Sequence, residues 1–223
     1  MNYDSLQKLS YLKRDITYKN KPGIRMHKFS NRLGSIEQDP FIGFVGRDFE
    51  QTQCKVLFLG KSNAESKHEE IDRQINQALL CFKSSEENKE IFYKQYANRY
   101  FEAMPRWNIS RFVNEFRNLT KLSLHQIAYA NIVPYRYIGA PNNAAYKIAF
   151  KNFTNQFIEI IKPDLIVPLG ANLEEIIIKN LITDRKIYVT KGINREGRDK
   201  RIAEVGWQTI LNAVEDYENK QRG

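Results

Sequence analysis

Short apolar runs separated by amphipathic stretches organise this chain. The runs fall at residues 56–60, 127–133, 165–170 and 186–190. Their length and their glycine, proline or polar stops predict strands buried on both faces of a sheet. Between and after them, apolar residues recur at helical spacing. The predicted helices cover residues 3–16, 69–80, 91–104, 109–119, 144–161, 173–181 and 202–217.

Strands that alternate with helices in this way predict an α/β fold. We expect a three-layer α/β/α sandwich with a central four-stranded parallel sheet. Because crossovers between parallel strands are right-handed, the carboxyl ends of all four strands meet at one edge of the sheet. Ligands of open α/β sheets bind outside that edge. It is therefore the first place to look for chemistry.

Residues 1–50 differ in character from the rest of the chain. The stretch 19–46 repeatedly contains glycine, proline, lysine and arginine. We expect an N-terminal extension at 1–50, loop-rich, basic and packed on the core, followed by one α/β domain at 51–223. The extension either wraps the core and touches phosphate or forms a solvated surface arm.

The net charge of the chain favours one class of binding partner. The chain has 223 residues and a formal net charge of +9, with 35 Lys and Arg against 26 Asp and Glu. Lysine and arginine release condensed counterions when they bind phosphates, so this balance favours nucleic acid. No apolar run approaches the roughly 20 residues needed to span a bilayer, and the N-terminus has no signal-peptide core. We expect a cytoplasmic protein with no membrane partner.

Metal and cofactor chemistry find no support in the sequence. Cys54 and Cys81 lack metal-site spacing, and the three histidines are scattered. The chain has no G-x-G-x-x-G, no P-loop and no G-x-S-x-G motif. We therefore expect no metal and no cofactor, and two reduced core thiols.

The turn after the first strand is the leading candidate for chemistry. After the run 56–60 come small and polar residues, among them Ser62, Asn63 and Glu65, at the carboxyl end of a buried strand. In the alternative interpretation, Gly60 merely lets the chain turn and Ser62 or Asn63 caps the next helix.

Motifs in several segments point to one family by their order and spacing. Residues 56–64 form an apolar strand with a glycine-led turn, 131–136 read Asn-Ile-Val-Pro-Tyr-Arg, and 162–170 read Lys-Pro-Asp, an apolar run and Leu-Gly. Over about residues 54–215 the chain resembles the uracil-DNA glycosylase superfamily. In that family the first turn positions water, and the strand after it supplies an asparagine that reads the base edge. Residues 96–101 resemble, more weakly, the Asn-Arg-aromatic helix of its mismatch-specific branch.

Two departures from the family pattern affect the expected substrate. The first turn lacks the usual proline after the catalytic position. The loop after the fourth strand begins at Lys191 and lacks the usual histidine, which stabilises the departing base anion. Both departures suit a pocket for a different or bulkier base. Asn194 and Arg195 are the candidates to replace the histidine.

A glycosylase needs a flipped base held in a pocket and a water oriented towards the sugar. The resemblance implies that the catalytic candidates are Asn63, Ser62 and Glu65. The candidates for contact with the base are Gly60, Lys61, Asn131, Tyr135 and Phe82. The alternatives are a first-turn carboxylate favoured by the helix dipole for Glu65, a structural hydrogen bond for Asn131 and core packing for Phe82.

A basic loop follows the fourth strand at residues 191–201. Gly192 and Gly197 allow its backbone to approach a ligand closely, and arginines beside such a loop suit phosphate contacts. In the alternative interpretation the loop is simply solvated. The candidates for nucleic-acid binding are Arg136, Lys191, Asn194, Arg195, Arg198, Lys200 and Arg201.

These features together predict a monomeric, monofunctional DNA glycosylase that needs no cofactor. It would excise uracil or a modified, bulky, phage-type pyrimidine and leave an abasic site, in base-excision repair or in defence against phage. One alternative is a catalytically inactive DNA-binding module on the same fold. Another is an α/β enzyme that acts on a small nucleotide or sugar phosphate.

Overall fold

A computed structural model describes residues 3–12, 42–63, 69–83, 87–103, 114, 117–118, 120–136, 140–170, 172–192, 211–212, 215–216 and 219. The strands are β1 (Phe44–Val45), β2 (Val56–Asn63), β3 (Ile127–Arg136), β4 (Leu165–Leu169) and β5 (Tyr188–Val189). The helices are α1 (Asp4–Ser10), α2 (Glu69–Leu80), α3 (Lys89–Ala103), α5 (Asn143–Ala149), α6 (Asn155–Ile161) and α7 (Leu173–Asn180). Short helical turns are η2 (Phe49–Gln51), η3 (Cys81–Lys83), η5 (Leu124–Gln126) and the π-helical η6 (Phe150–Thr154).

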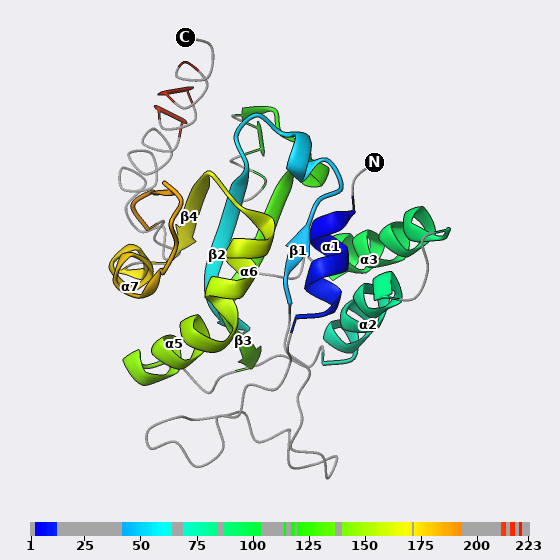
Figure 1. Ribbon diagram of the computed structural model, residues 1–223, viewed down its shortest axis with the longest axis horizontal. Helices are drawn as coiled ribbons and strands as arrows, with labels where there is room; N and C mark the ends of the chain where they lie inside the picture. The colour runs from blue at the N-terminus through cyan, green and yellow to red at the C-terminus, as the bar shows by residue number, and fades with distance from the viewer. Residues whose placement is uncertain are drawn as a thin grey trace.

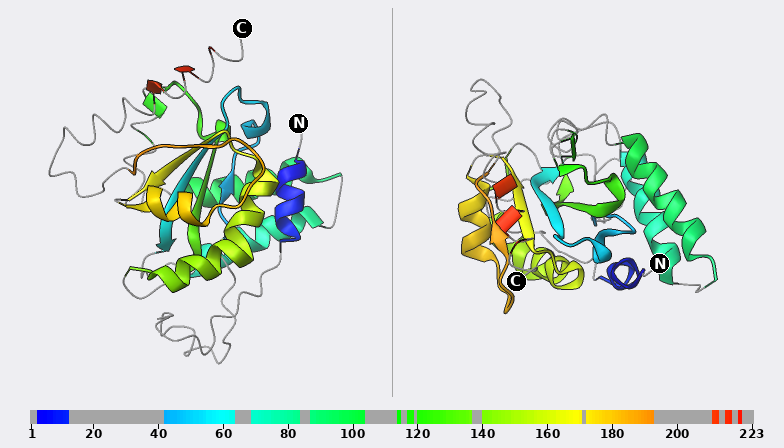
Figure 2. Two further views of the ribbon diagram at one scale, coloured as in Figure 1. Left: turned by 60° about the vertical axis from the view of Figure 1, so that its left-hand side comes forward. Right: turned by 90° about the horizontal axis from the view of Figure 1, so that it is seen from above.

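The described strands form one mixed sheet in the order β1-β3-β2-β4-β5 (Figure 1). β2, β3, β4 and β5 run parallel, and β1 runs antiparallel to β3. Helices α2 and α3 lie on one side of the sheet and α7 on the other (Figure 2). The α/β class is therefore confirmed. The expectation of a purely parallel sheet of four strands is wrong, because β1 adds a fifth strand in the opposite direction.

Burial on both faces explains the apolar runs that predict β2 and β4. Val56, Leu57, Phe58 and Leu59 are all fully buried, and every residue of β4 is buried as well. Burying one such aliphatic or aromatic side chain stabilises the fold by about 1.5–3 kcal/mol. The centre of the sheet is thus fixed by hydrophobic burial on two sides.

β1 comes from the segment that the sequence predicts to be a loop-rich arm. Gly43 has a φ of +102°, and a Cβ atom there would lie 2.6 Å from the backbone oxygen of Tyr129. Gly46 is equally crowded, since its Cβ would lie 2.1 Å from the backbone oxygen of His125. A strand of two residues between two such glycines has no hydrophobic period, which is why it escapes sequence analysis.

Two strand ends also differ from the prediction. β2 does not turn at Gly60 but continues to Asn63. β5 covers only Tyr188–Val189, because its hydrogen bonds with β4 end early. Tyr188 and Thr190 donate to the carbonyls of Asp164 and Ile166. The next β4 position that faces β5 is Pro168, which has no N–H to continue the ladder.

The predicted helix at 144–161 is one helical stretch with a π-helical segment in its middle. Asn142 caps its start, with the side chain accepting a hydrogen bond from the Ala145 N–H at 2.9 Å. Inside the π segment, the Thr154 hydroxyl donates to the carbonyl of Ile132 at 2.8 Å. The stretch ends at Lys162, which adopts a left-handed conformation with φ of 51°, one residue before Pro163.

The other predicted helices divide into confirmed ones and ones outside the described residues. α2 has the predicted bounds, and α3 and α7 agree within two residues of each end, whereas α1 ends at Ser10, six residues before the predicted end. Most of 109–119 and 202–217 falls outside the described residues. No helix in the described parts of the chain is long and apolar enough to cross a membrane.

Candidate functional site

The carboxyl ends of β2, β3 and β4 form the edge at which the sequence places the site. Gly60 pairs in register with Asn131 of β3 on one side and with Leu169 of β4 on the other. Further along, Ser62 pairs with Val133. In-register residues of parallel strands project on the same face of the sheet. Gly60 and Asn131 therefore share a face, level with the end of β4 and three and five residues before the ends of β2 and β3.

The carboxamide of Asn131 lies directly over Gly60. A Cβ atom at Gly60 would be 2.4 Å from Asn131 Oδ1, so no larger residue fits there without movement. The Tyr129 hydroxyl donates a hydrogen bond to the same oxygen at 3.0 Å. Asn131 is 2% exposed and Tyr129 is 5% exposed. We call Gly60, Tyr129 and Asn131 the carboxyl-end unit.

This geometry corrects the reason for a glycine at position 60. Among the described glycines, Gly43 and Gly170 have a positive φ, and Gly60 does not. The strand also continues past Gly60. The residue is needed because the Asn131 side chain occupies the space that a Cβ would fill. The alternative in which Ser62 or Asn63 caps the next helix is wrong as well, since α2 begins only at Glu69.

Lys61 projects to the opposite face of the sheet from Asn131. A Cβ at Gly170, whose φ is +148°, would lie 2.9 Å from Lys61 Cε and 3.5 Å from Leu173 Cδ1. The lysine stem therefore packs over the connection between β4 and α7. The structure brings Gly60 and Asn131 together, and it places Lys61 away from them.

Phe82 lies in the core between α1 and α3. It is fully buried, and its ring packs against those of Tyr3, Phe92 and Tyr96 at centroid distances of 5.9, 6.2 and 6.5 Å. A ring enclosed on these sides has no exposed face on which a base can stack. Its observed role is the alternative one, core packing.

The remaining candidates are placed by the backbone or lie outside the described residues. A register shift at the end of β2 pairs Asn63 with Arg136, so these two residues occupy adjacent strand ends. Tyr135 is the residue before Arg136 in β3. Lys191 is exposed just after β5. The positions outside the described residues are Glu65, Asn194, Arg195, Arg198, Lys200 and Arg201.

A second polar region ties β1 and the segment after it to α3 and to the start of β3. The Tyr96 hydroxyl donates to the Gly43 carbonyl at 2.7 Å and accepts from the Val45 N–H at 3.1 Å. The Tyr93 hydroxyl accepts from the Arg47 N–H at 3.0 Å and lies 2.8 Å from His125 Nδ1. We call Tyr93, Tyr96, His125, Arg47 and Glu90 the β1 network.

Nearby charges and burial determine the ion pairing and the pKa values of the ionisable groups in the β1 network. The Arg47 guanidinium lies 3.4 Å from Glu90, which also accepts a short hydrogen bond from the Tyr3 hydroxyl. Burial raises the pKa of Tyr93 and of Tyr96 well above the usual range. Burial also lowers the pKa of His125, and the nearby Arg47 adds to this effect. The lowered pKa keeps His125 neutral at pH 7, with Nδ1 within hydrogen-bond distance of the Tyr93 hydroxyl.

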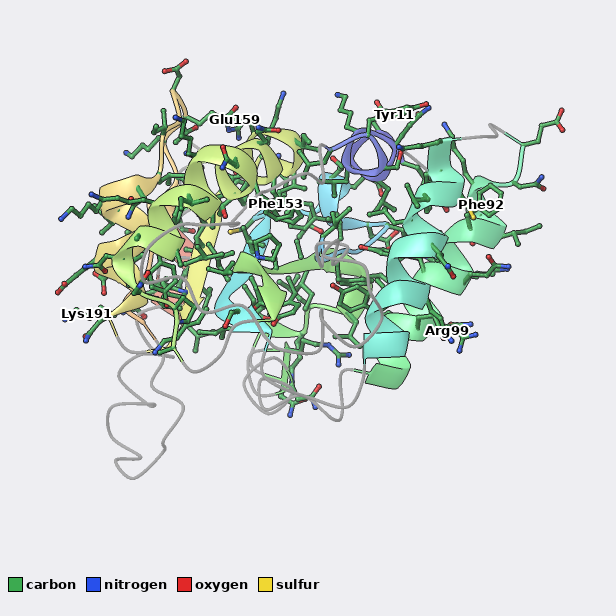
Figure 3. All side chains as sticks on the ribbon, turned by 90° about the horizontal axis from the view of Figure 1, so that it is seen from below. Tyr11, Phe92, Arg99, Phe153, Glu159 and Lys191 are labelled. Atoms are coloured by element: carbon green, nitrogen blue, oxygen red, sulfur yellow. The ribbon has the colours of Figure 1, made fainter. Side chains whose placement is uncertain are left out.

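A groove between α2 and α3 holds none of the predicted site residues. Its cavity volume is about 430 Å³. In Figure 3 its residue Arg99 lies on the opposite flank of the molecule from Lys191. The lining is mostly carboxamides, contributed by Gln74, Gln77, Gln95 and Asn98, together with Ala78, Cys81 and Arg99.

Metal ligands and known relatives give no further guide to this site. Within the described ranges, no group of three or more His, Cys, Asp or Glu side chains could hold a metal ion. Comparison with known proteins found no matching protein-family model and no significant match among curated proteins. The candidate site therefore stands on its residues and their geometry.

Sequence reasoning misses one member of the carboxyl-end unit, Tyr129. The signal was available, because Tyr129 and Asn131 are two residues apart in one strand and so share a face. A polar pair on one face of an apolar strand needs internal hydrogen bonds. That requirement alone would have indicated a contact between the two side chains.

Proposed function

We propose that this protein is a monofunctional DNA glycosylase of the uracil-DNA glycosylase superfamily, which excises uracil or a modified pyrimidine and leaves an abasic site. The observation that carries the proposal is the Asn131 carboxamide, buried over Gly60 in adjacent parallel strands, level with the carboxyl end of β4. A buried amide at this edge is suited to hydrogen bonding with the edge of a flipped base.

The pairing of β2 with β3 also supports different roles for the residues at the two strand ends. Asn63, the candidate for orienting water, ends β2 beside Arg136, the candidate for phosphate contact. Water would attack the sugar carbon, the N-glycosidic bond would break, and its electron pair would leave with the base. Hydrogen-bond donors near the base then stabilise the anion. Ser62 and Glu65 are the further candidates for orienting the water.

The position of Lys61 favours a monofunctional mechanism. A bifunctional glycosylase needs an amine that attacks the sugar and forms a covalent intermediate. The Lys61 stem packs over Gly170, on the face of the sheet opposite to Asn131. A hydrolytic reaction that ends at the abasic site is therefore the expected outcome, with no strand break.

The test is an abasic-site assay on defined DNA. Purified protein, in buffer that contains chelator, is incubated with uracil-containing DNA, plain DNA and DNA with modified cytosines. We expect abasic sites on one modified substrate only, and none with the Asn63→Ala variant. Salt-sensitive DNA binding without product on any substrate would instead identify an inactive DNA-binding module. Binding of free nucleotides but not DNA would identify an enzyme of small nucleotides.

A further inference from the structure

β2 and β3 lose their regular pairing at a proline. The two strands pair residue for residue up to Ser62 and Val133, and the next pair is Asn63 with Arg136. A regular ladder would pair Asn63 with Pro134. β3 therefore has two extra residues at this point, which is a β-bulge. Bulges bend a strand and re-aim its residues, and they are common beside active sites.

The alternation of backbone groups shows that the missing donor of Pro134 faces β2. Successive residues of a strand turn their N–H and C=O groups towards opposite neighbouring strands. The Gly46 N–H, next to β1, donates to the Ile127 carbonyl, so the even-numbered residues of β3 face β2. The Leu165 N–H of β4 donates to the Lys55 carbonyl, so the even-numbered residues of β2 face β3. Pro134 is thus at a position whose N–H would continue this ladder, and proline has none.

The next residue of β3 that faces β2 and has an N–H is Arg136, and this is the residue that pairs with Asn63. Paired Cα atoms of neighbouring strands lie about 5 Å apart. In a regular ladder the Cα atoms of Asn63 and Arg136 would lie about 8 Å apart, because each residue adds about 3.3 Å along the strand. The bulge therefore brings Arg136 back to the end of β2.

We propose that Pro134 is a positioning residue, which interrupts the ladder so that Arg136, the candidate for phosphate contact, lies beside Asn63, the candidate for orienting water. The inference rests on the proposed glycosylase function and concerns the same site. Pro134 is buried in the sheet and acts through Arg136. The sugar that water attacks carries a phosphate, so adjacent strand ends suit the two contacts. A proline inside a strand removes a ladder hydrogen bond, and the placement of Arg136 explains why one is present here.

The first experiment tests the register in the protein alone. The variant Asn63→Cys/Arg136→Cys is oxidised, and peptide mass mapping distinguishes the new disulfide from any that involves Cys54 or Cys81. A disulfide needs Cα atoms about 4.4–6.8 Å apart. We therefore expect the disulfide to form with Pro134 in place, and its yield to fall about fivefold or more when Pro134→Ala is added.

The matched pair is Ser62→Cys/Val133→Cys, which lies in the regular part of the ladder. Its disulfide should form equally with and without Pro134→Ala, which shows that the fold is intact. Pro134→Val, which adds the same N–H with a residue that favours strands, is measured in parallel. If neither substitution at Pro134 lowers the yield of the disulfide between positions 63 and 136, the inference is overturned.

The second experiment measures the contribution of Arg136 to DNA binding. DNA with one non-cleavable 2′-fluoro-2′-deoxyuridine is bound over a series of salt concentrations, where each phosphate contact adds about one to the slope of log K against log salt. We expect Arg136→Ala and Pro134→Ala each to lower this slope by about one, and the double variant to lower it no further. The control is Pro168→Ala, which adds an N–H to a buried proline of β4 and should leave the slope unchanged. A purely structural role of Pro134 would not change the slope.

These readouts separate the inference from the proposed function. If Arg136→Ala keeps the full slope, or if Pro134→Ala keeps it although the register has changed, the inference is overturned even when uracil is excised. If the disulfide and the slope both depend on Pro134 but no base is excised, the positioning role is supported and only the catalytic part of the proposed function fails. A protein that binds no DNA overturns both.

Discussion

Buried tyrosines in two regions of the molecule use their hydroxyls differently. In the β1 network, the Tyr96 hydroxyl bonds to backbone groups of Gly43 and Val45, whereas the Tyr93 hydroxyl bonds to the Arg47 N–H and to the His125 side chain. In the carboxyl-end unit, Tyr129 bonds to the side chain of Asn131. Backbone groups must be paired wherever they are buried, so the contacts of Tyr96 are explained by folding alone.

The carboxyl-end unit is not explained in that way. An apolar pair at positions 129 and 131 would satisfy the sheet equally well, because burying a polar group costs free energy that its hydrogen bond only offsets. The unit also restricts position 60 to glycine. The comparison separates a hydroxyl that pairs buried backbone groups, that of Tyr96, from one that pairs a buried carboxamide inside the sheet, that of Tyr129. Four predictions test this difference.

The largest effect is expected for Asn131→Ala. If the carboxamide contacts the base, excision in single-turnover assays falls by roughly 100-fold or more, the range seen when one preorganised donor is removed from an active site. DNA affinity changes little, because phosphate contacts dominate it. If the variant keeps wild-type excision, Asn131 is a structural residue like Tyr96. The carboxyl-end unit would then have the same role in folding as the β1 network.

The next effect concerns stability and tests the contact between Gly60 and Asn131. Gly60→Ala places a Cβ 2.4 Å from Asn131 Oδ1, and we expect the free energy of unfolding to fall by about 1–3 kcal/mol. When Asn131 is already alanine, Gly60→Ala should lower the free energy of unfolding by at least about 1 kcal/mol less than it does in the wild-type background. Urea denaturation of the four proteins of this cycle measures the coupling.

Gly170→Ala is the matched control for that cycle. Its glycine has a φ of +148° and its Cβ would approach Lys61 Cε at 2.9 Å, so the substitution also destabilises the fold. Because Lys61 and Asn131 are on opposite faces of the sheet, Asn131→Ala should give no rescue of Gly170→Ala. Asn131→Ala could instead reduce the loss of stability equally for Gly60→Ala and Gly170→Ala. That result would show a general change in the stability of the fold and no specific contact between Gly60 and Asn131.

The sequence predicts the central sheet well because burial on two faces leaves a strong pattern. β2, β3 and β4 appear as apolar runs, and α2 is predicted with its observed bounds. β1 cannot be predicted in the same way, since two residues have no period. Its position depends on Gly43, Gly46 and two tyrosine hydroxyls from α3, which are contacts between segments distant in the chain.

The candidate site is predicted in part for a related reason. Gly60 and Asn131 are identified from local features of the sequence, a glycine that closes an apolar run and an amide inside another apolar run. Lys61 and Phe82 also look suitable in sequence. Lys61 is separated from Asn131 by strand alternation, and Phe82 by enclosure among the rings of other helices. The face and depth of a side chain depend on tertiary packing, which local spacing does not contain.

A smaller effect is expected for Tyr96→Phe in the β1 network. The change leaves the Val45 N–H and the Gly43 carbonyl without their hydroxyl partner, which should lower the free energy of unfolding by about 1–2 kcal/mol. Excision per folded molecule should be unchanged, in contrast to Asn131→Ala. Reduced excision at full folding, measured with active-site titration, would mean that the β1 network reaches the site.

The smallest effect is a pH dependence of stability that arises from His125. Burial holds its pKa below the ordinary value of 6.5, so between these two pKa values the unfolded chain binds more protons than the folded one. The contribution of neutral His125 is therefore complete above about pH 6.5 and is lost as the pH falls towards the folded-state pKa. In the protonated form both ring nitrogens carry a hydrogen, so Nδ1 can then only donate to the Tyr93 hydroxyl, which already accepts from the Arg47 N–H.

His125→Gln, which cannot titrate, isolates this contribution. The difference in melting temperature between wild type and His125→Gln should be constant above pH 7 and should shift in favour of the variant between pH 6.5 and pH 5. Excision measured at one temperature well below melting should show no matching shift, because His125 lies before β3 and bonds Tyr93, whereas Asn131 lies six residues further along and bonds Tyr129. A parallel shift in excision would connect the β1 network to the chemistry and remove the contrast between the two tyrosine groups.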